Sequence, residues 1–190
     1  MPAKLAIADQ MTIEEFLTFY ESRPDGEKWE LIEGVAVMSP SPTDWHQLIC
    51  SNLVAYLLNH KNNRGTSWLP MLGVGTRVPV SPQSLPEPDV FVKAGPLTGT
   101  SVTDDALVLF EVLSKANTKA DRAWRKRVYA SVPNCQHYVT VSALTAEVMR
   151  HDRATGWEED AVSGLVETLS LPAIGVTIPL RDIYRWTPIE

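Results

Sequence analysis

An acidic residue inside an apolar segment is the feature of this sequence that most directly suggests chemistry. Residues 106–113 read ALVLFEVL, an almost continuous apolar run that is typical of a strand covered on both faces. Because side chains alternate between the faces of a strand, Glu111 shares its face with leucines. A buried, unpaired carboxylate is strongly unfavourable. Glu111 therefore needs a metal ion, a basic partner or protonation, unless it lies where the strand ends and meets solvent.

A second carboxylate, Asp89, begins the predicted strand PDVFVK directly after Pro88. Since proline restricts the residue before it to extended backbone, the chain enters this strand from a defined direction. Taken alone, Asp89 is an ordinary strand-edge residue that accepts hydrogen bonds from a turn. Two carboxylates on neighbouring strands, in contrast, form a hard oxygen site that suits Mg²⁺ or Mn²⁺. Such a cation activates water and stabilises charge on a phosphoryl oxygen.

The elements that position these residues follow from local signals. Thr12 and Glu15 form a capping-box pattern, which predicts a short helix from about residue 13. Residues 28–38 predict two strands joined at Glu33 and Gly34. Apolar periodicity and turn residues further predict helices over 44–62 and 119–131, strands over 66–72, 74–80, 88–93, 106–113, 136–141 and 146–152, a loop over 94–104, and short strands after 165.

This order predicts an α/β (mixed α+β) fold, in which helices flank a mixed central sheet. We expect residues 1–10 to form a flexible N-terminal tail and residues 11–190 to form a single domain, which suits a chain of 190 residues.

Composition excludes several classes of protein. The two cysteines, Cys50 and Cys135, give neither a disulfide framework nor zinc-ligand spacing, so a reducing cytoplasmic location is expected. No apolar run approaches the roughly 18 residues of a membrane span, and neither GxxxxGK[ST] nor GxGxxG occurs. We therefore expect no membrane association and no nucleotide cofactor. The net charge of −6 argues weakly against indiscriminate binding of nucleic acid.

An ordered set of short motifs resembles a bacterial family. The motifs are WELIEG at 29–34, SPSPTDWHQ at 39–47, EPDVFV at 87–92, FEVLS at 110–114, DRAWRKRVY at 121–129 and QHYVTV at 136–141. Each is weak alone, but their order and spacing over about residues 11–185 resemble the Uma-type restriction endonuclease domain of the PD-(D/E)XK nuclease superfamily. The resemblance implies a restriction-endonuclease-like fold, a nuclease-like domain over 11–190, and hydrolysis of DNA by a homodimer that uses Mg²⁺ or Mn²⁺.

The resemblance also implies roles for individual residues. Asp89 and Glu111 are similar to the acidic motif residues that hold the metal ion, and Glu30 matches an acidic residue that approaches the same ion. Glu30 is otherwise an exposed strand residue. His46 matches a histidine at the start of the long helix, where it either contacts phosphate or substrate or helps to cap the helix.

The basic residue of the superfamily motif is missing at its usual place. Leu113 stands two positions after Glu111, where a lysine is expected. Uma-type proteins place a lysine in the following helix, four residues before a tyrosine, and that position here is Arg125, with Lys126 beside it. Arginine stays protonated, so Arg125 could stabilise phosphate charge but not act as a base.

Two interpretations stay open on this evidence. Arg125, assisted by Lys126, completes a catalytic site with Asp89, Glu111 and Glu30. In the alternative, the chain is an inactive nuclease-fold module that binds nucleic acid or a protein partner. Independently of function, Arg125, Lys126 and Arg127 could lie on a solvated helix face, where Arg125 could form a surface pair with Asp121.

Overall fold

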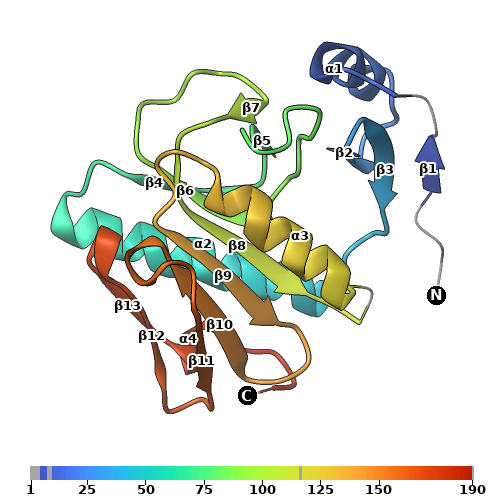
Figure 1. Ribbon diagram of the computed structural model, residues 1–190. Helices are drawn as coiled ribbons and strands as arrows, with labels where there is room; N and C mark the ends of the chain where they lie inside the picture. Colours follow the sequence, from blue (N-terminus) through green and yellow to red (C-terminus); the bar gives the residue numbers. More distant parts are fainter. Residues whose placement is uncertain (1–4, 8–9, 116, 190) are drawn as a thin grey trace.

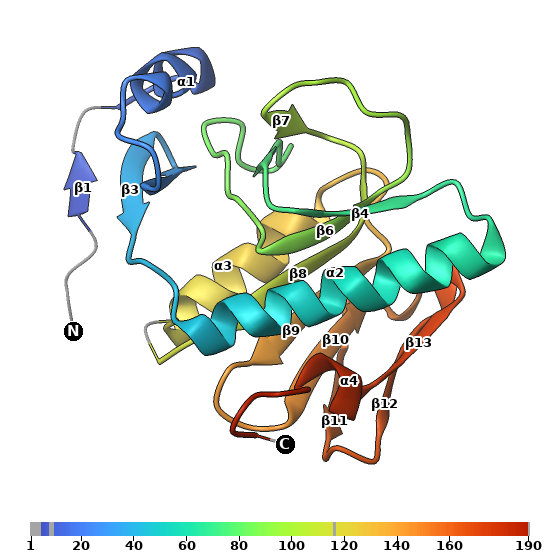
Figure 2. The same ribbon diagram turned by 180° about the vertical axis from the view of Figure 1, so that it is seen from behind.

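A six-stranded mixed sheet with a helix on each face dominates the computed structural model, which describes residues 5–7, 10–115 and 117–189. Within these ranges the strand order is β11 (Glu159–Ser163), β10 (Glu147–Asp152), β9 (His137–Ser142), β8 (Ala106–Leu113), β6 (Val90–Lys93) and β4 (Leu69–Leu72). Neighbouring strands are antiparallel except β8 and β9, which are parallel. The helix α3 (Lys119–Ala130) forms the crossover between these two strands. Figures 1 and 2 show α3 on one face and α2 (Asp44–Arg64) on the other. The predicted fold class is confirmed.

Local sequence signals explain the helix ends. The predicted capping box starts α1 (Ile13–Glu21), because Thr12 and Glu15 each accept a hydrogen bond from the other's backbone N–H. Thr118 caps α3 in the same way. Gly65 ends α2 in the left-handed conformation, at a φ of 64°.

The N-terminal segment forms a separate three-stranded sheet. β2 (Lys28–Ile32) and β3 (Val35–Ser39) make the predicted hairpin, with positive φ at Glu33 and Gly34 as a tight hairpin turn requires. β1 (Leu5–Ile7) pairs with β3, so the expected tail over residues 1–10 does not hold for these three residues. These residues add an edge strand to the sheet, which no local sequence pattern predicts. The rest of the expected tail, apart from residue 10, lies outside the described residues.

A predicted strand is wrong at residues 74–80. Only β5 (Gly75–Thr76) is extended there, and it pairs with β7 (Val102–Thr103), which lies inside the segment predicted as a loop. Pro79 and Pro82 lack the N–H that a longer ladder would use, so the chain turns instead.

Three apolar clusters lie around these layers. The largest packs the sheet against α2 and against the C-terminal elements β12 (Thr168–Leu171), β13 (Val176–Pro179) and α4 (Leu180–Ile183). Two short 3₁₀ turns, Arg153–Thr155 and Pro172–Ile174, complete this region. A second cluster lies under α3, and a third joins α1 to the N-terminal hairpin. Among the helices of the described ranges, none has the length and apolarity needed to cross a bilayer.

Candidate active site

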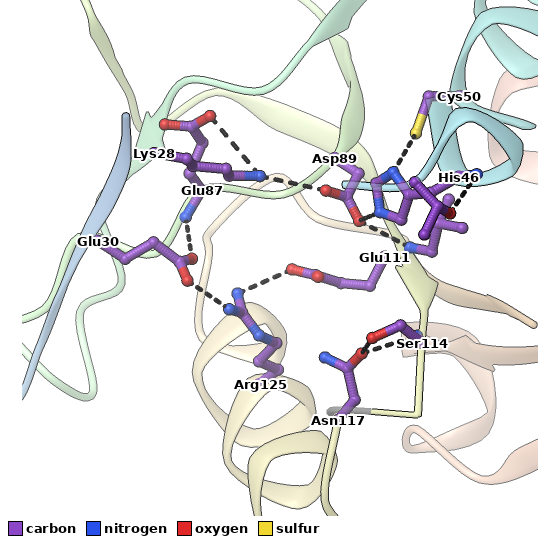
Figure 3. A network of polar contacts seen from close by, with 12 residues as sticks. Lys28, Glu30, His46, Cys50, Glu87, Asp89, Glu111, Ser114, Asn117 and Arg125 are labelled. Atoms are coloured by element: carbon purple, nitrogen blue, oxygen red, sulfur yellow. Dashed lines mark hydrogen bonds and ion pairs between the residues drawn. The ribbon is translucent and has the colours of Figure 1, made fainter. Parts of the chain in front are cut away.

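The structure brings Asp89 and Glu111 together, because β6 and β8 are neighbours. The antiparallel register pairs Val90 with Phe110, so one residue further along Asp89 lies opposite Glu111. The Asp89 N–H donates to the Phe110 carbonyl oxygen at 3.0 Å. Both carboxylates are largely buried, and Figure 3 shows them near the centre of a polar network.

Arg125 lies inside this network and not on a solvated surface. Its guanidinium donates to Glu30 Oε2 at 2.7 Å and to Glu111 Oε1 at 2.9 Å, as Figure 3 shows. Tyr129, one turn later in α3, also donates to Glu111 Oε1, at 2.8 Å. The proposed surface pair with Asp121 is therefore wrong, since Asp121 caps α3 through Thr118. The five-donor fork of arginine suits this bridge between two carboxylates.

Glu30 is buried and directed toward Arg125. Its second oxygen, Oε1, accepts from the Glu87 backbone N–H at 2.7 Å. The interpretation of Glu30 as an exposed strand residue is thus excluded, because its exposed fraction is 2%.

Lys28 is the cation that sequence reasoning missed. Its Nζ lies 3.1 Å from Asp89 Oδ1 and 3.7 Å from Glu87 Oε1. Burial would lower the pKa of Lys28, but Asp89 and Glu87 outweigh burial and raise it. Lys28 therefore stays protonated and places a charged amine beside Asp89. Strand periodicity could have found it, since Lys28 and Glu30 stand two residues apart in β2 and so share a face.

His46 connects α2 to the carboxylates. Its backbone N–H donates to Thr43 Oγ1, so the residue takes part in the helix cap. Its ring nitrogen Nε2 lies 3.2 Å from Asp89 Oδ2, and Nδ1 lies 3.7 Å from Cys50 Sγ. Burial and the charge of Asp89 raise the pKa of the Cys50 thiol to about 12. The thiol therefore stays protonated and can donate to Nδ1.

Lys126 lies outside the polar network around Asp89 and Glu111. Its Nζ lies 3.6 Å from Glu159 Oε1 on β11, and both side chains are substantially exposed. The neighbouring position on α3 thus faces a different part of the molecule, as its rotation of about 100° from Arg125 requires.

Acid outnumbers base in the described part of this cluster. Four carboxylates act electrostatically on one another and on the cations Lys28 and Arg125. The four are Glu30, Glu87, Asp89 and Glu111. Four carboxylates therefore face two cations in this cluster.

The pKa values reflect this imbalance. Burial raises the pKa of Glu111 to about 7 despite the opposing charge of Arg125, and the charges of Asp89 and Glu30 add to the rise. Burial alone would also raise the pKa of Asp89, but the hydrogen bond from His46 and the charge of Lys28 hold it well below its usual value. Asp89 is thus ionised, whereas burial and the neighbouring negative charges favour the protonated form of Glu111.

The donor set suits a divalent cation in part. Asp89 and Glu111 offer hard oxygen ligands from adjacent strands, in a cluster where four carboxylates face two cations. Glu30 is bonded elsewhere, through both oxygens. Consistent with this, no group of three or more His, Cys, Asp or Glu side chains in the described ranges is arranged to hold a metal ion. Asp89 and Glu111 are thus the adjacent pair of carboxylates in this cluster, and Glu30 is joined to this pair through Arg125.

Comparison with known proteins places this chain in a family. A family model described as "Uma2: Putative restriction endonuclease" matches residues 13–181. No curated protein matched. A solved structure from Anabaena variabilis ATCC 29413, described as "a putative nuclease belonging to DUF820", superposes with a TM-score of 0.74 over 93% of this chain and 98% of that chain. Its sequence identity is 16%, so it establishes a shared fold. Because the family model covers most of the sequence, this chain belongs to the Uma2 restriction endonuclease family.

Proposed function

We propose that this protein is a DNA endonuclease that hydrolyses phosphodiester bonds at Asp89 and Glu111 with a bound Mg²⁺ or Mn²⁺. Family membership supports the class of reaction. The observation that carries the proposal is the position of Asp89 opposite Glu111, in a cluster where four carboxylates face two cations, because a divalent cation there would reduce the repulsion between the carboxylates. When bound, such an ion would activate water and stabilise charge on the phosphoryl group.

Each polar residue of the site has a separate role in this proposal. Asp89 and Glu111 would hold the ion and thereby position the scissile phosphate. Lys28 is partly exposed and protonated, so it can contact a phosphate oxygen and stabilise the charge that develops there. Arg125 is saturated by two carboxylates, so we assign it a positioning role, in place of the direct phosphate contact expected from the sequence.

Cleavage assays test this proposal directly. Supercoiled plasmid DNA, linear duplex DNA and single-stranded RNA would be incubated with the purified chain in Mg²⁺, in Mn²⁺ and in EDTA. We expect DNA cleavage with either ion and none in EDTA. A faster reaction on RNA would overturn the assignment of DNA as the substrate, and equal products in EDTA would overturn the role of the ion. Sedimentation of the same preparation tests the predicted homodimer.

Replacing Lys28 by methionine is expected to slow cleavage about a hundredfold, because the transition state would lose one positive charge. Methionine keeps the length and apolar stem of lysine. The matched control is Lys61→Met, in the last turn of α2, which should leave the rate unchanged. The rate constant under saturating substrate is the quantity to compare. Equal rates in the two variants would exclude Lys28 from the reaction.

Divalent ions should also stabilise the folded protein. At an ion concentration about 100 times the dissociation constant, we expect the melting temperature to rise by about 5–10 °C, because only the folded chain holds Asp89 and Glu111 together. Differential scanning calorimetry with Mn²⁺ or with EDTA measures this rise. An unchanged melting temperature at millimolar Mn²⁺ would contradict the two-carboxylate site.

One observation favours a second function. Both oxygens of Asp89 already have partners, because Lys28 contacts Oδ1 while His46 and the Val112 N–H contact Oδ2. A site satisfied in this way could belong to a non-catalytic module that binds nucleic acid or a protein partner. Calorimetric titration separates the two functions, since salt-sensitive DNA binding without Mn²⁺ binding would support the module.

A further inference from the structure

A cavity of about 720 Å³ lies between α3 and the strands β9 and β10, with the start of β11 at its rim. Figure 1 shows α3 in front of β8 and β9, which leaves the same face of β10 without a helix over it. The volume falls within the range of about 300–1,000 Å³ that is typical of small-molecule sites. None of the carboxylates of the candidate active site lines this cavity.

Two buried polar atoms belong to residues that line the cavity and lack a hydrogen-bond partner in the described part of the chain. They are Tyr138 Oη and His151 Nδ1. The exposed fractions are 0% for Tyr138 and 4% for His151, so solvent does not replace the missing bonds. The two rings stack with their centroids 5.6 Å apart. Buried polar groups are rarely left unpaired, so this pair of atoms indicates a ligand with hydrogen-bonding groups along one edge.

Positive charge lines the wall that α3 contributes. Lys119 and Arg122 lie in its N-terminal half, and neither has an ion pair with any described residue. Lys126 lines the same wall but is paired with Glu159. Arg122 and Tyr138 both line the cavity. The wall therefore suits an anionic group positioned beside the two unpaired polar atoms.

We propose that this cavity binds a nucleotide. Met149 and Trp157 supply apolar surface for the base. Tyr138 and His151 would bond the edge of that base, and Lys119 and Arg122 would bind the phosphate. A nucleotide combines a flat base, polar edges and a phosphate, which are the three features that the cavity matches.

The cavity adjoins the candidate active site, so the inference rests on the proposed nuclease function. Tyr138 separates the two: its ring packs against Tyr129, which bonds Glu111, at a centroid distance of 5.3 Å. A nucleotide in the cavity would thus lie one side chain away from Glu111. It would be a subsite for a neighbouring nucleotide of the substrate strand, or for a free nucleoside monophosphate of the same chemistry.

Calorimetric titration in EDTA tests the cavity without cleavage. The probes are adenosine 5′-monophosphate, adenosine, inorganic phosphate, and a single-stranded DNA of about ten nucleotides. We expect the monophosphate or the DNA to bind. Binding of both indicates a free-nucleotide site, and binding of the DNA alone indicates a strand subsite. Binding of neither overturns the proposal.

Substitutions locate the binding. Tyr138→Phe should weaken binding about fivefold and leave the melting temperature unchanged or higher, because it removes an unpaired hydroxyl. The matched control, Tyr56→Phe, should do the reverse, since Tyr56 Oη donates to the Thr177 carbonyl oxygen at 2.7 Å. Tyr138→Phe with unchanged affinity would overturn the assignment.

A second substitution addresses the phosphate. Arg122→Met should weaken binding of the monophosphate about tenfold without changing the affinity for adenosine. Arg64→Met, in the last turn of α2, is the control. The outcome is separable from that of the nuclease proposal. Binding with this pattern in a chain that cuts no nucleic acid supports the cavity alone, whereas cleavage with no effect of Arg122→Met on affinity supports hydrolysis alone.

Discussion

Replacing Arg125 by methionine is expected to lower the free energy of unfolding by about 3–5 kcal/mol at neutral pH, because two buried carboxylates would lose their shared cation. Glu30 is 2% exposed and Glu111 is 4% exposed, so water cannot replace the guanidinium. Urea denaturation of the metal-free protein measures the change.

The adjacent residue offers a matched control. Lys126→Met removes a cation from the same helix, but its partner Glu159 is largely exposed, so the loss should not exceed about 1 kcal/mol. Adding Glu111→Gln to Arg125→Met should recover part of the stability, because it removes one of the two unpaired charges. Equal losses from Arg125→Met and Lys126→Met would show that the network does not stabilise the fold.

Replacing Asp89 by asparagine should reduce divalent-ion-dependent cleavage about a thousandfold or more. The change removes one of two anionic ligands, and several kcal/mol of transition-state stabilisation corresponds to this factor. Asparagine keeps the size of aspartate and one acceptor oxygen for the Val112 N–H, which Asp89 binds at 2.8 Å. The initial rate on plasmid DNA and the Mn²⁺ affinity are the two measurements.

The control for charge alone is Asp182→Asn, in α4, where the same change should alter neither quantity. The unfolding free energy of Asp89→Asn must be measured beside its rate, so that a folding defect is not mistaken for lost chemistry. A variant that is folded and cleaves DNA as fast as the unaltered protein would remove Asp89 from the reaction.

The sequence predicts the elements whose signals are local. The capping box at Thr12 and Glu15, the turn at Glu33 and Gly34, and the apolar run of β8 each depend on residues close together in the chain. These elements appear in the structure within a few residues of their predicted bounds. Two of the elements that were missed, β1 and β7, are short and exist through partners far along the sequence.

The contrast between local signals and distant contacts also explains which site residues could be predicted. Asp89 and Glu111 could be paired because each begins or interrupts an apolar strand. Lys28 looks like any strand lysine until the hairpin is placed beside Asp89, 61 residues later. Arg125 looks like a surface residue because its helix is rich in charge, and only packing against Glu30 and Glu111 buries it. The imbalance of charge became visible only when all six groups were located in space.

The Arg125–Glu30 pair has a consequence for the order of folding. It joins positions 95 residues apart, and the chain between them contributes α2, β4, β6 and β8. Closing so long a loop costs entropy that must be offset by contacts already formed. We therefore expect the sheet around β8 to form first and the N-terminal hairpin to dock last. Until the hairpin docks, the carboxylates of the cluster stay hydrated. They lose their water only when Lys28 and Arg125 are close enough to compensate their charge.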